Sequence, residues 1–128
     1  MSNAEKLFIL AKQNRENAYA PYSKFKVGAA ILTADGKFFG GCNVENSSYP
    51  CGTCAEAGAI SDMIATGERK IAEILIVADA KCIVPCGNCL QKIAEFADGD
   101  TVVYSANLQG IVATHKLKDL FTPFSLRK

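Results

Sequence analysis

Two short cysteine-containing segments of this 128-residue chain hold the residue types that could do chemistry. They are Cys51-Gly52-Thr53-Cys54-Ala55-Glu56 and Pro85-Cys86-Gly87-Asn88-Cys89, and each contains two cysteines separated by two residues. Thiolates at this spacing are common zinc ligands. The chain has six cysteines and no secretory signal at its start, which favours metal ligands or free thiols over disulfides. The sequence therefore predicts a zinc site.

Two ligand sets are compatible with these segments. If Cys51 joins the other three cysteines, the zinc is fully ligated and structural. The interval from Cys54 to Cys86 is longer than the roughly 15 to 20 residues of a zinc ribbon, however, and a chain that is 49% hydrophobic has little need of metal to fold. If only Cys54, Cys86 and Cys89 bind, a fourth position stays open for water and the zinc is catalytic. The interval favours the open site and leaves Cys51 without an assigned role.

A catalytic zinc of this kind needs a proton acceptor beside the water, and Glu56 is the candidate. Because residues two apart point to different sides of a helix, Cys54 and Glu56 can converge only if Cys54 lies at the very start of its helix. Pro85 favours a second helix start, from which Cys86 and Cys89, three residues apart, can face one point. Three thiolates and one Zn²⁺ sum to 2 − 3 = −1, a charge that two helix N-termini would stabilise.

The apolar patterns along the chain predict one mixed sheet. Ser2 or Asn3 can cap a first helix that Pro21 ends, Gly67 ends a second helix, and Ala34-Asp35-Gly36 forms a hairpin turn. The expected elements are that first helix, strands 25–33 and 37–42, a loop at 43–53, a helix at 54–66, a strand at 71–78, a helix at 87–97, strands 101–105 and 111–114, and one helical turn at 117–120. This order predicts an α/β fold with a single mixed β-sheet of about five strands sandwiched by helices, in one domain over residues 1–128.

Charge and hydropathy exclude several classes of protein. Fourteen basic and thirteen acidic residues leave a formal charge of +1, which gives no broad positive field for a nucleic acid. Residues 1–10 lack the features of a secretory signal, and no apolar stretch reaches the roughly 18 to 20 residues that span a bilayer. We therefore expect a cytoplasmic protein with a small-molecule partner rather than a nucleic acid or a membrane.

The chain resembles the small homotetrameric cytidine deaminases from Tyr22 to Phe124. A cysteine, a glutamate two residues later and a following P-C-x-x-C are typical of zinc deaminases. The motifs that carry the resemblance are Pro21-Tyr22-Ser23-x-Phe25-x-Val27-Gly28-Ala29-Ala30, Gly41-x-Asn43-Val44-Glu45-Asn46-x-x-Tyr49, Cys54-Ala55-Glu56 and Pro85-Cys86-Gly87-x-Cys89-x-Gln91. The resemblance implies one Zn²⁺ per chain and hydrolytic deamination of cytidine or 2′-deoxycytidine to the uracil nucleoside and ammonia, in pyrimidine salvage.

The same resemblance implies a substrate-binding set. Asn43 and Glu45 would hold the ribose hydroxyls, Phe25 would pack on the nucleoside, and Ala55 lies inside the Cys-Ala-Glu motif. Phe124 matches an aromatic residue that reaches the base in a neighbouring subunit, so the active sites of a homotetramer would be completed across subunits. Without the resemblance, Asn43 and Glu45 could equally cap backbone groups in an exposed turn, and Phe25 could be a core residue.

Two positions depart from the family pattern. The family usually has arginine after the Cys-Ala-Glu and after the second cysteine of P-C-x-x-C, where this chain has Ala57 and Leu90. A cluster without those cations keeps more negative charge or relies on backbone N–H groups. Blasticidin-type deaminases also lack the first arginine, so a modified cytosine or another aminopyrimidine nucleoside is an alternative substrate. Two further alternatives are a four-cysteine structural zinc module and a deaminase that edits nucleic acid.

Overall fold

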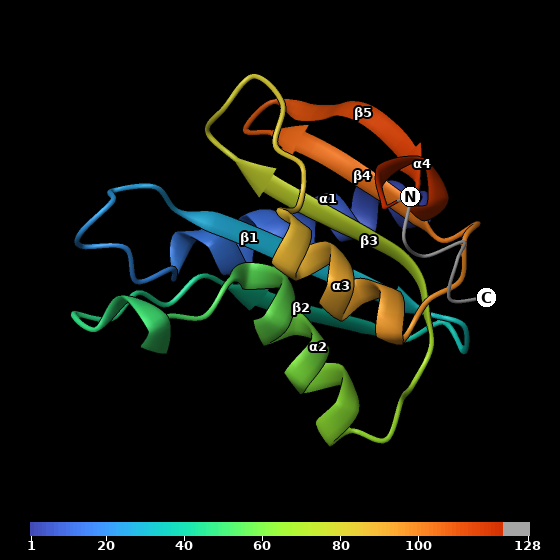
Figure 1. The fold of residues 1–128 in the computed structure, drawn as a ribbon. Coiled ribbons are helices and arrows are strands. Elements are labelled where there is room, and N and C mark those ends of the chain that lie inside the picture. The colour runs from blue at the N-terminus through green and yellow to red at the C-terminus, as the bar shows by residue number, and fades with distance from the viewer. Residues whose placement is uncertain (122–128) are drawn as a thin grey trace.

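A five-stranded mixed sheet forms the centre of the molecule in the computed structural model, which describes residues 1–121 (Figure 1). The strands are β1 (Val27–Thr33), β2 (Phe38–Cys42), β3 (Ile71–Ala78), β4 (Val102–Asn107) and β5 (Gly110–Lys116). Their order across the sheet is β2-β1-β3-β4-β5. Strands β3 and β4 are parallel and every other neighbouring pair is antiparallel. The predicted mixed sheet of about five strands is confirmed.

Helices cover both faces of this sheet. The helices are α1 (Asn3–Glu16), α2 (Ala55–Ala65), α3 (Gly87–Glu95), the single turn α4 (Leu117–Leu120) and the 3₁₀ turn η1 (Tyr49–Cys51). In Figure 1, α2 and α3 lie in front of the sheet and α1 lies behind it. The result is a three-layer α/β sandwich, as the order of elements predicted. Within residues 1–121, no helix is long and apolar enough to cross a bilayer.

Alternating side chains divide the interior into two hydrophobic clusters, one on each side of the sheet. Ile74 and Ile76 of β3 pack toward α2 and α3, whereas Leu75 and Val77 pack toward α1. All four side chains are fully buried, which accounts for the unbroken apolar run of this strand. Strand β3 is the central strand, as its sequence predicted.

Glycines let the helices approach the sheet closely. A Cβ atom on Gly28 of β1 would lie 2.0 Å from the carbonyl oxygen of Ala11 in α1. A Cβ atom on Gly41 of β2 would lie 2.4 Å from the backbone nitrogen of Ala59 and 2.6 Å from the carbonyl oxygen of Ala55, both in α2. Only glycine permits these two contacts, and the second one fixes where α2 begins.

Several element boundaries differ from the sequence prediction. Strand β1 begins at Val27 rather than Phe25, because the Asn43 side chain takes over the hydrogen bonds that a neighbouring strand would make there. Its Oδ1 accepts from the Val27 N–H and its Nδ2 donates to the Phe25 carbonyl, both at 2.9 Å. Helix α3 ends at Glu95 instead of Ala97. Strands β4 and β5 extend toward each other around a tight turn in which the Asn107 Oδ1 accepts from two backbone N–H groups.

Candidate active site

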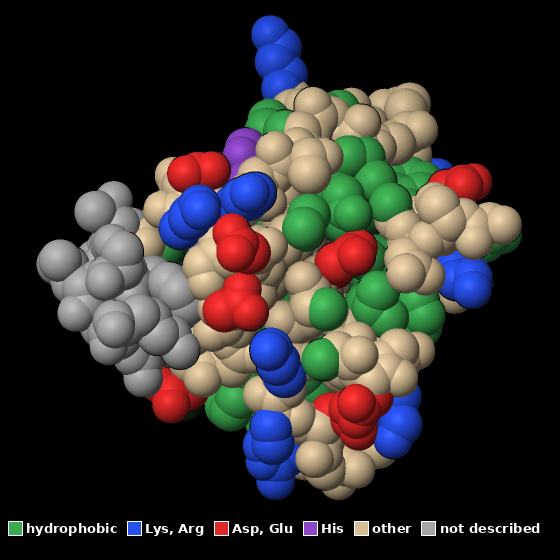
Figure 2. Space-filling view, turned by 90° about the vertical axis from the view of Figure 1, so that its right-hand side faces the viewer, with side chains coloured by type: hydrophobic (Ala, Val, Ile, Leu, Met, Phe, Trp, Pro, Cys, Tyr) green, Lys and Arg blue, Asp and Glu red, His purple; other side chains and the backbone are tan. Residues whose placement is uncertain are grey.

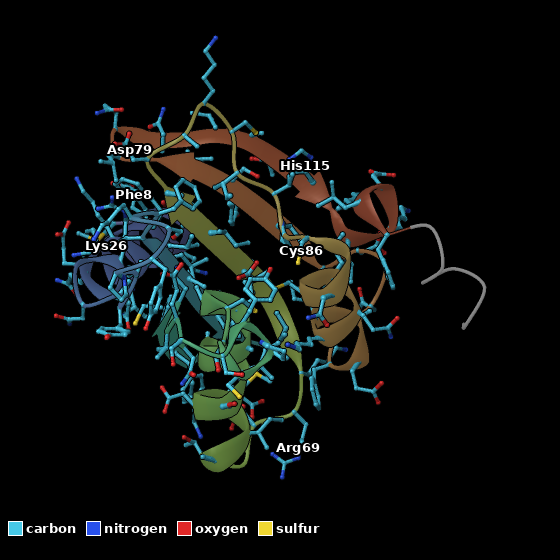
Figure 3. The ribbon with its side chains drawn as sticks, turned by 60° about the vertical axis from the view of Figure 1, so that its left-hand side comes forward. Phe8, Lys26, Arg69, Asp79, Cys86 and His115 are labelled. Atoms are coloured by element: carbon cyan, nitrogen blue, oxygen red, sulfur yellow. The ribbon has the colours of Figure 1, made fainter. Side chains whose placement is uncertain are left out.

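Helices α2 and α3 begin close together and place the candidate metal ligands. Cys54 is the N-cap residue of α2, and Cys86 is the N-cap residue of α3. Cys89 lies in the first turn of α3, three residues after Cys86. Figure 3 shows Cys86 at the start of α3. The chain reaches that start directly from the carboxyl end of β3, which is where open α/β sheets usually bind ligands.

The side chains of Cys54, Glu56 and Cys89 meet at this point. One ligand atom from each of the three residues lies within 4.8 Å of the other two. The Cys89 Sγ donates a hydrogen bond to the Cys54 Sγ at 2.7 Å, and neither cysteine is in a disulfide. Glu56 is only 5% exposed and Cys89 only 2%. Cys54 and Glu56 converge because Cys54 precedes the first turn of its helix, the condition that the sequence required.

Cys86 and Cys51 lie at the margin of this cluster. Cys86 is exposed and its sulfur is not part of the compact group, although its side chain is near enough to Cys89 to help raise the pKa of that thiol. Cys51 is exposed at the end of η1 and also lies outside the group. The structure therefore brings together two of the three predicted ligands with the predicted proton acceptor. The full ligand set stays a prediction.

The pair formed by half-buried Cys54 and buried Cys89 holds one negative charge. The hydrogen bond from Cys89 lowers the pKa of Cys54 to about 6, and the backbone N–H of Ala57 and the charge of Lys92 lower it further against the effect of burial. The same hydrogen bond and burial raise the pKa of Cys89. Cys54 is thus the thiolate of the pair and Cys89 its proton donor. A preformed thiolate at a helix N-terminus suits a metal ligand.

The pKa of the Glu56 carboxyl group lies near neutral pH. Burial and the neighbouring charge of Cys54 raise its pKa from 4.5 to about 7. A carboxyl group with this pKa has both its protonated and its ionised forms populated under physiological conditions. It can therefore accept a proton at one step and return it at the next.

A cleft of about 740 Å³ opens above the cluster, within the usual range for small-molecule sites. Cys54, Glu56, Cys86 and Cys89 line one part of it. Three of the predicted substrate-binding residues also line it: Asn43, Glu45 and Ala55. Phe25 lies outside this set, with a side chain that is 37% exposed. Phe124, the fifth predicted residue, lies outside the described residues.

Asn43 and Glu45 also organise the backbone around the cleft. The Asn43 amide bridges Phe25 and Val27, as described above, which leaves one N–H and part of its oxygen for a ligand. The Glu45 carboxylate accepts hydrogen bonds from the backbone N–H groups of Tyr22 and Ser23 and from the Ser23 hydroxyl. These donors hold the pKa of Glu45 below its usual range, the Ser23 hydroxyl most of all. The capping role and the binding role proposed for these residues are therefore compatible.

Comparison with known proteins places the chain in a family. A family model described as the cytidine and deoxycytidylate deaminase zinc-binding region matches residues 1–106. A cytidine deaminase from Sporosarcina psychrophila is 48% identical over 109 residues, which cover 84% of this chain and 80% of that protein. The chain belongs to the cytidine deaminase family. A cytidine deaminase from Halalkalibacterium halodurans is 46% identical over 111 residues, covering 86% and 84% of the two chains.

The fold agrees with that of solved cytidine deaminases. The crystal structure of cytidine deaminase from Burkholderia pseudomallei is similar with a TM-score of 0.87 and 45% identity, covering 94% of this chain and 96% of that one. The zinc that the family requires suits the donors present here, because two thiols and a carboxyl group converge with a third thiol beside them. Sulfur donors select zinc over the magnesium or calcium that an all-oxygen site would take. Zinc is the cofactor of this cytidine deaminase.

The roles of two residues that line the cleft were not predicted from the sequence. Ser23 positions the Glu45 carboxylate, and Lys92 lines the cleft and acts on Cys54 and Glu56 through its charge. Nothing local in the sequence connects Ser23 with Glu45, which lies 22 residues away. Lys92 follows Cys89 by three residues, so helical spacing could have placed it on the ligand side of α3.

Proposed function

We propose that this protein is a zinc-dependent deaminase that converts cytidine or 2′-deoxycytidine to the uracil nucleoside and ammonia by hydrolysis. The observation that supports this reaction most directly is the convergence of Cys54, Cys89 and Glu56 within 4.8 Å at two helix N-termini beside a nucleoside-sized cleft. The family match supports the same chemistry. A role in pyrimidine salvage and a cytoplasmic location follow from this proposal and stay predictions.

The chain's own residues divide the work of the reaction. Cys54, Cys86 and Cys89 would hold the zinc. When bound, zinc supplies a Lewis acid that makes water a nucleophile at neutral pH. Glu56 would accept one proton from the attacking water and pass it to ring N3, and would then take the second proton from the new C4 hydroxyl and pass it to the amino group, which leaves as ammonia. Its pKa of about 7 allows transfer in both directions, and its burial excludes bulk water as a competing proton donor.

Asn43, Glu45 and Ala55 would orient the nucleoside. The remaining N–H of Asn43 can donate to a ribose hydroxyl, and an ionised Glu45 can accept from one. Both residues are held by hydrogen bonds to the segment before β1 or to its first residue, so they offer their polar atoms in a fixed place. Ala55 lies at the start of α2 and lines the cleft beside Cys54 and Glu56.

We further propose that the active sites are completed in a homotetramer. Tyr22, Val44 and Tyr49 line the cleft and expose 60%, 48% and 94% of their surfaces, respectively. Exposed apolar side chains that gather at one site are typical of an interface. Sedimentation velocity of the purified protein should give a single species of four chains. A monomer with full activity would contradict this part of the proposal.

Two cysteine variants separate the catalytic site from a structural zinc module. Cys51→Ala should retain zinc and activity, since Cys51 does not line the cleft, whereas Cys86 lines it and has its side chain beside that of Cys89. Cys86→Ala should lose both, because it removes a ligand. Metal analysis of the two purified variants is the measurement. Loss of zinc from both variants would favour the four-cysteine structural module, and retention of zinc in Cys86→Ala would reject the proposed ligand set.

An ultraviolet absorbance assay with a panel of substrates tests the function itself. The panel contains cytidine, 2′-deoxycytidine, cytosine, adenosine and blasticidin S, and we expect turnover of the first two. Blasticidin S belongs in the panel because uncharged Ala57 and Leu90 follow Glu56 and Cys89, where the resemblance to the family implies arginine. On the face shown in Figure 2, Lys and Arg are interspersed with Asp and Glu, which gives no support to a nucleic-acid substrate. No turnover of any cytosine nucleoside by zinc-loaded protein would overturn the proposal.

A further inference from the structure

A second cavity, of about 340 Å³, lies beside the loop that joins α1 to β1. It is lined by three cations, Arg15 at the end of α1 and Lys24 and Lys26 in the loop. Its other walls are Tyr19 and three small or apolar residues of segment 18–21. Within the described part of the chain, no acidic side chain lines this cavity, which is called the basic pocket below.

Arg15 offers the basic pocket a shielded cation with free hydrogen-bond donors. Only 15% of its side chain is exposed. Its Nε donates to the Lys26 carbonyl oxygen at 3.3 Å, and its Nη1 lies 3.5 Å from the Glu16 carboxylate. The second distance is longer than the about 2.7–2.9 Å of a strong charge-assisted hydrogen bond. Because a guanidinium group has five N–H donors in a planar fork, most of them stay available to a ligand, and phosphate oxygens match that fork.

Lys24 has an unusual backbone conformation at the edge of the pocket. Its φ is 61°, which makes it the one residue other than glycine with a positive φ among residues 1–121. The conformation is fixed by a hydrogen bond of 3.0 Å from the Lys24 N–H to the Ala20 carbonyl oxygen. Non-glycine residues held in this region cluster at ligand-binding segments, where the strain serves a purpose. Lys24 also acts on the Glu45 carboxylate in the cleft, but it is the smallest of the influences on that group.

The charges around the basic pocket favour a ligand with two negative charges. Arg15, Lys24 and Lys26 carry three positive charges, and the neighbouring Glu16 carries one negative charge, which leaves 3 − 1 = +2. The Lys26 Nζ donates to the Glu16 carbonyl oxygen at 3.3 Å, a neutral partner that does not balance its charge. A phosphate group carries about −1.5 to −2 at pH 7. A carboxylate, or one phosphodiester of a nucleic acid, carries only a single negative charge.

We propose that the basic pocket binds a phosphate group, either as free phosphate or on a small organic molecule. Its volume is near the lower end of the about 300–1,000 Å³ range of small-molecule sites, so the ligand is small. The Tyr19 wall is already fixed, because its N–H donates to the Asn43 carbonyl oxygen at 3.0 Å and its carbonyl oxygen accepts from the Glu45 N–H at 2.8 Å. The basic pocket shares no lining residue with the cleft, so this site is separate from the proposed deaminase function.

Isothermal titration calorimetry of the zinc-loaded protein with inorganic phosphate tests the proposal, at neutral pH and constant ionic strength. Lys24→Gln and Lys26→Gln should each weaken phosphate binding about fivefold, the upper range for a charge that water screens. Arg15→Lys should also weaken it, because the charge is kept and the planar fork is lost. Lys81→Gln is the matched control, since it removes the same charge from an exposed residue that lines neither the basic pocket nor the cleft. It should bind phosphate as the wild type does.

Phenyl phosphate and phenol separate the two sources of the phosphate group. Tighter binding of phenyl phosphate than of inorganic phosphate, with no binding of phenol, would identify a phosphate ester as the ligand. Equal affinity for the two phosphates would identify free phosphate. The absence of saturable binding by either phosphate would overturn the proposal and leave the three cations to offset the C-terminal end of α1. Equal weakening in Lys81→Gln and Lys24→Gln would also overturn it, because binding would then follow net charge alone. Turnover of cytidine, measured separately, decides the deaminase function independently of these results.

Discussion

The Glu56 carboxyl group lies close enough to Cys54 and Cys89 to have either of two roles. It could bind a metal, or it could accept and return protons beside the metal. Burial and a pKa raised to about 7 suit the second role, because such a carboxyl group can both accept and return a proton at neutral pH. Replacing Glu56 by glutamine keeps the shape and removes the proton acceptor. Turnover should fall by about 10² to 10⁴-fold or more, with an unchanged zinc content. The measurements are the absorbance assay and metal analysis of the same preparation.

The control for this substitution is Glu95→Gln, which changes the same residue type on the exposed side of α3. It should leave both turnover and zinc content close to those of the wild type. Normal turnover in Glu56→Gln would remove Glu56 from the mechanism. A loss of zinc in Glu56→Gln would make it a ligand instead.

Ser23 sets the ionisation of Glu45. Its hydroxyl is the largest cause of the lowered pKa, so Ser23→Ala should move the Glu45 pKa upward toward its ordinary value of 4.5. A depressed carboxyl pKa contributes stability above the pKa of the unfolded chain, and this contribution is lost as the pH falls through the lower folded value. At neutral pH, Ser23→Ala should therefore lose the contribution of the Ser23 hydroxyl to the free energy of unfolding. Below about pH 4.5, the stability of the variant should depend less on pH than that of the wild type. The Glu45 carboxyl ¹³C shift, followed through a pH titration, measures the change.

A second serine provides the comparison for Ser23→Ala. Ser48→Ala removes a hydroxyl from the same loop region, and the Glu45 carboxylate receives no hydrogen bond from that residue. The Glu45 pKa should be unchanged in Ser48→Ala. If Ser23→Ala also leaves it unchanged, the Ser23 hydroxyl does not hold the carboxylate.

Individual site residues could be predicted from the sequence where the contact is local. Cys54 and Glu56 lie two residues apart, and their meeting required only that a helix begin between them. The hydrogen bonds of Ser23 to Glu45 and of Asn43 to Val27 join residues 22 and 16 positions apart. Such contacts depend on how the loops fold back on each other, which apolar periodicity does not encode. The exposed position of Cys86 was likewise not predicted by its spacing from Cys89.

At the scale of elements, the position of α2 depends on a residue outside it. Gly41 of β2 faces the first turns of α2, and an added methyl group would meet two backbone atoms at 2.4 and 2.6 Å. Because backbone cannot move aside as a flexible side chain can, Gly41→Ala should displace α2 and with it Cys54. We expect a loss of about 1–3 kcal/mol in the free energy of unfolding, measured by urea titration, and a fall in zinc affinity.

Gly58 offers a matched glycine-to-alanine control within the helix itself. A Cβ atom there would meet its nearest neighbour, the carbonyl oxygen of Cys42, at an ordinary 3.5 Å. Because alanine favours helix more than glycine does, Gly58→Ala should stabilise the protein by about 0.5–1 kcal/mol. If Gly41→Ala lowers the free energy of unfolding and Gly58→Ala raises it, the loss in Gly41→Ala comes from the contact between β2 and α2. Destabilisation of the same size in both would contradict it.

Elements with a strong local pattern were predicted closely, and the others only in outline. Strand β3 has the predicted bounds because its apolar run is buried on both faces, and α2 begins and ends within one residue of expectation. The 43–53 loop was predicted as irregular, yet it holds η1 and is joined by single bridges from Val44 to Tyr19 and Thr53. The start of β1 was harder to predict, since an asparagine side chain replaces a strand partner there, whereas its end at Thr33 is where the sequence predicted it.

On the scale of the whole molecule, the fold is stabilised from both sides of the sheet by two hydrophobic clusters that contain none of the predicted metal ligands. One buried cluster lies between the sheet and the α2–α3 layer, and a second lies between the sheet and α1. The first cluster includes Ala55 and Leu90, which directly follow the predicted ligands Cys54 and Cys89. The packing of the hydrophobic core therefore does not depend on the metal ligands, in contrast to that of a small zinc finger.

Removing the metal should consequently abolish activity while leaving the fold intact. After dialysis against a strong zinc chelator, the far-ultraviolet circular dichroism should be unchanged, because both hydrophobic clusters persist. The melting temperature should fall, since a ligand that binds only the folded state contributes about 2.7 kcal/mol when its free concentration is 100 times the dissociation constant. Returning Zn²⁺ should restore turnover and the melting temperature together, whereas Mg²⁺ should restore neither, because sulfur donors bind it poorly. If the circular dichroism collapsed on chelation, the zinc would be a structural element and the open catalytic site would be excluded.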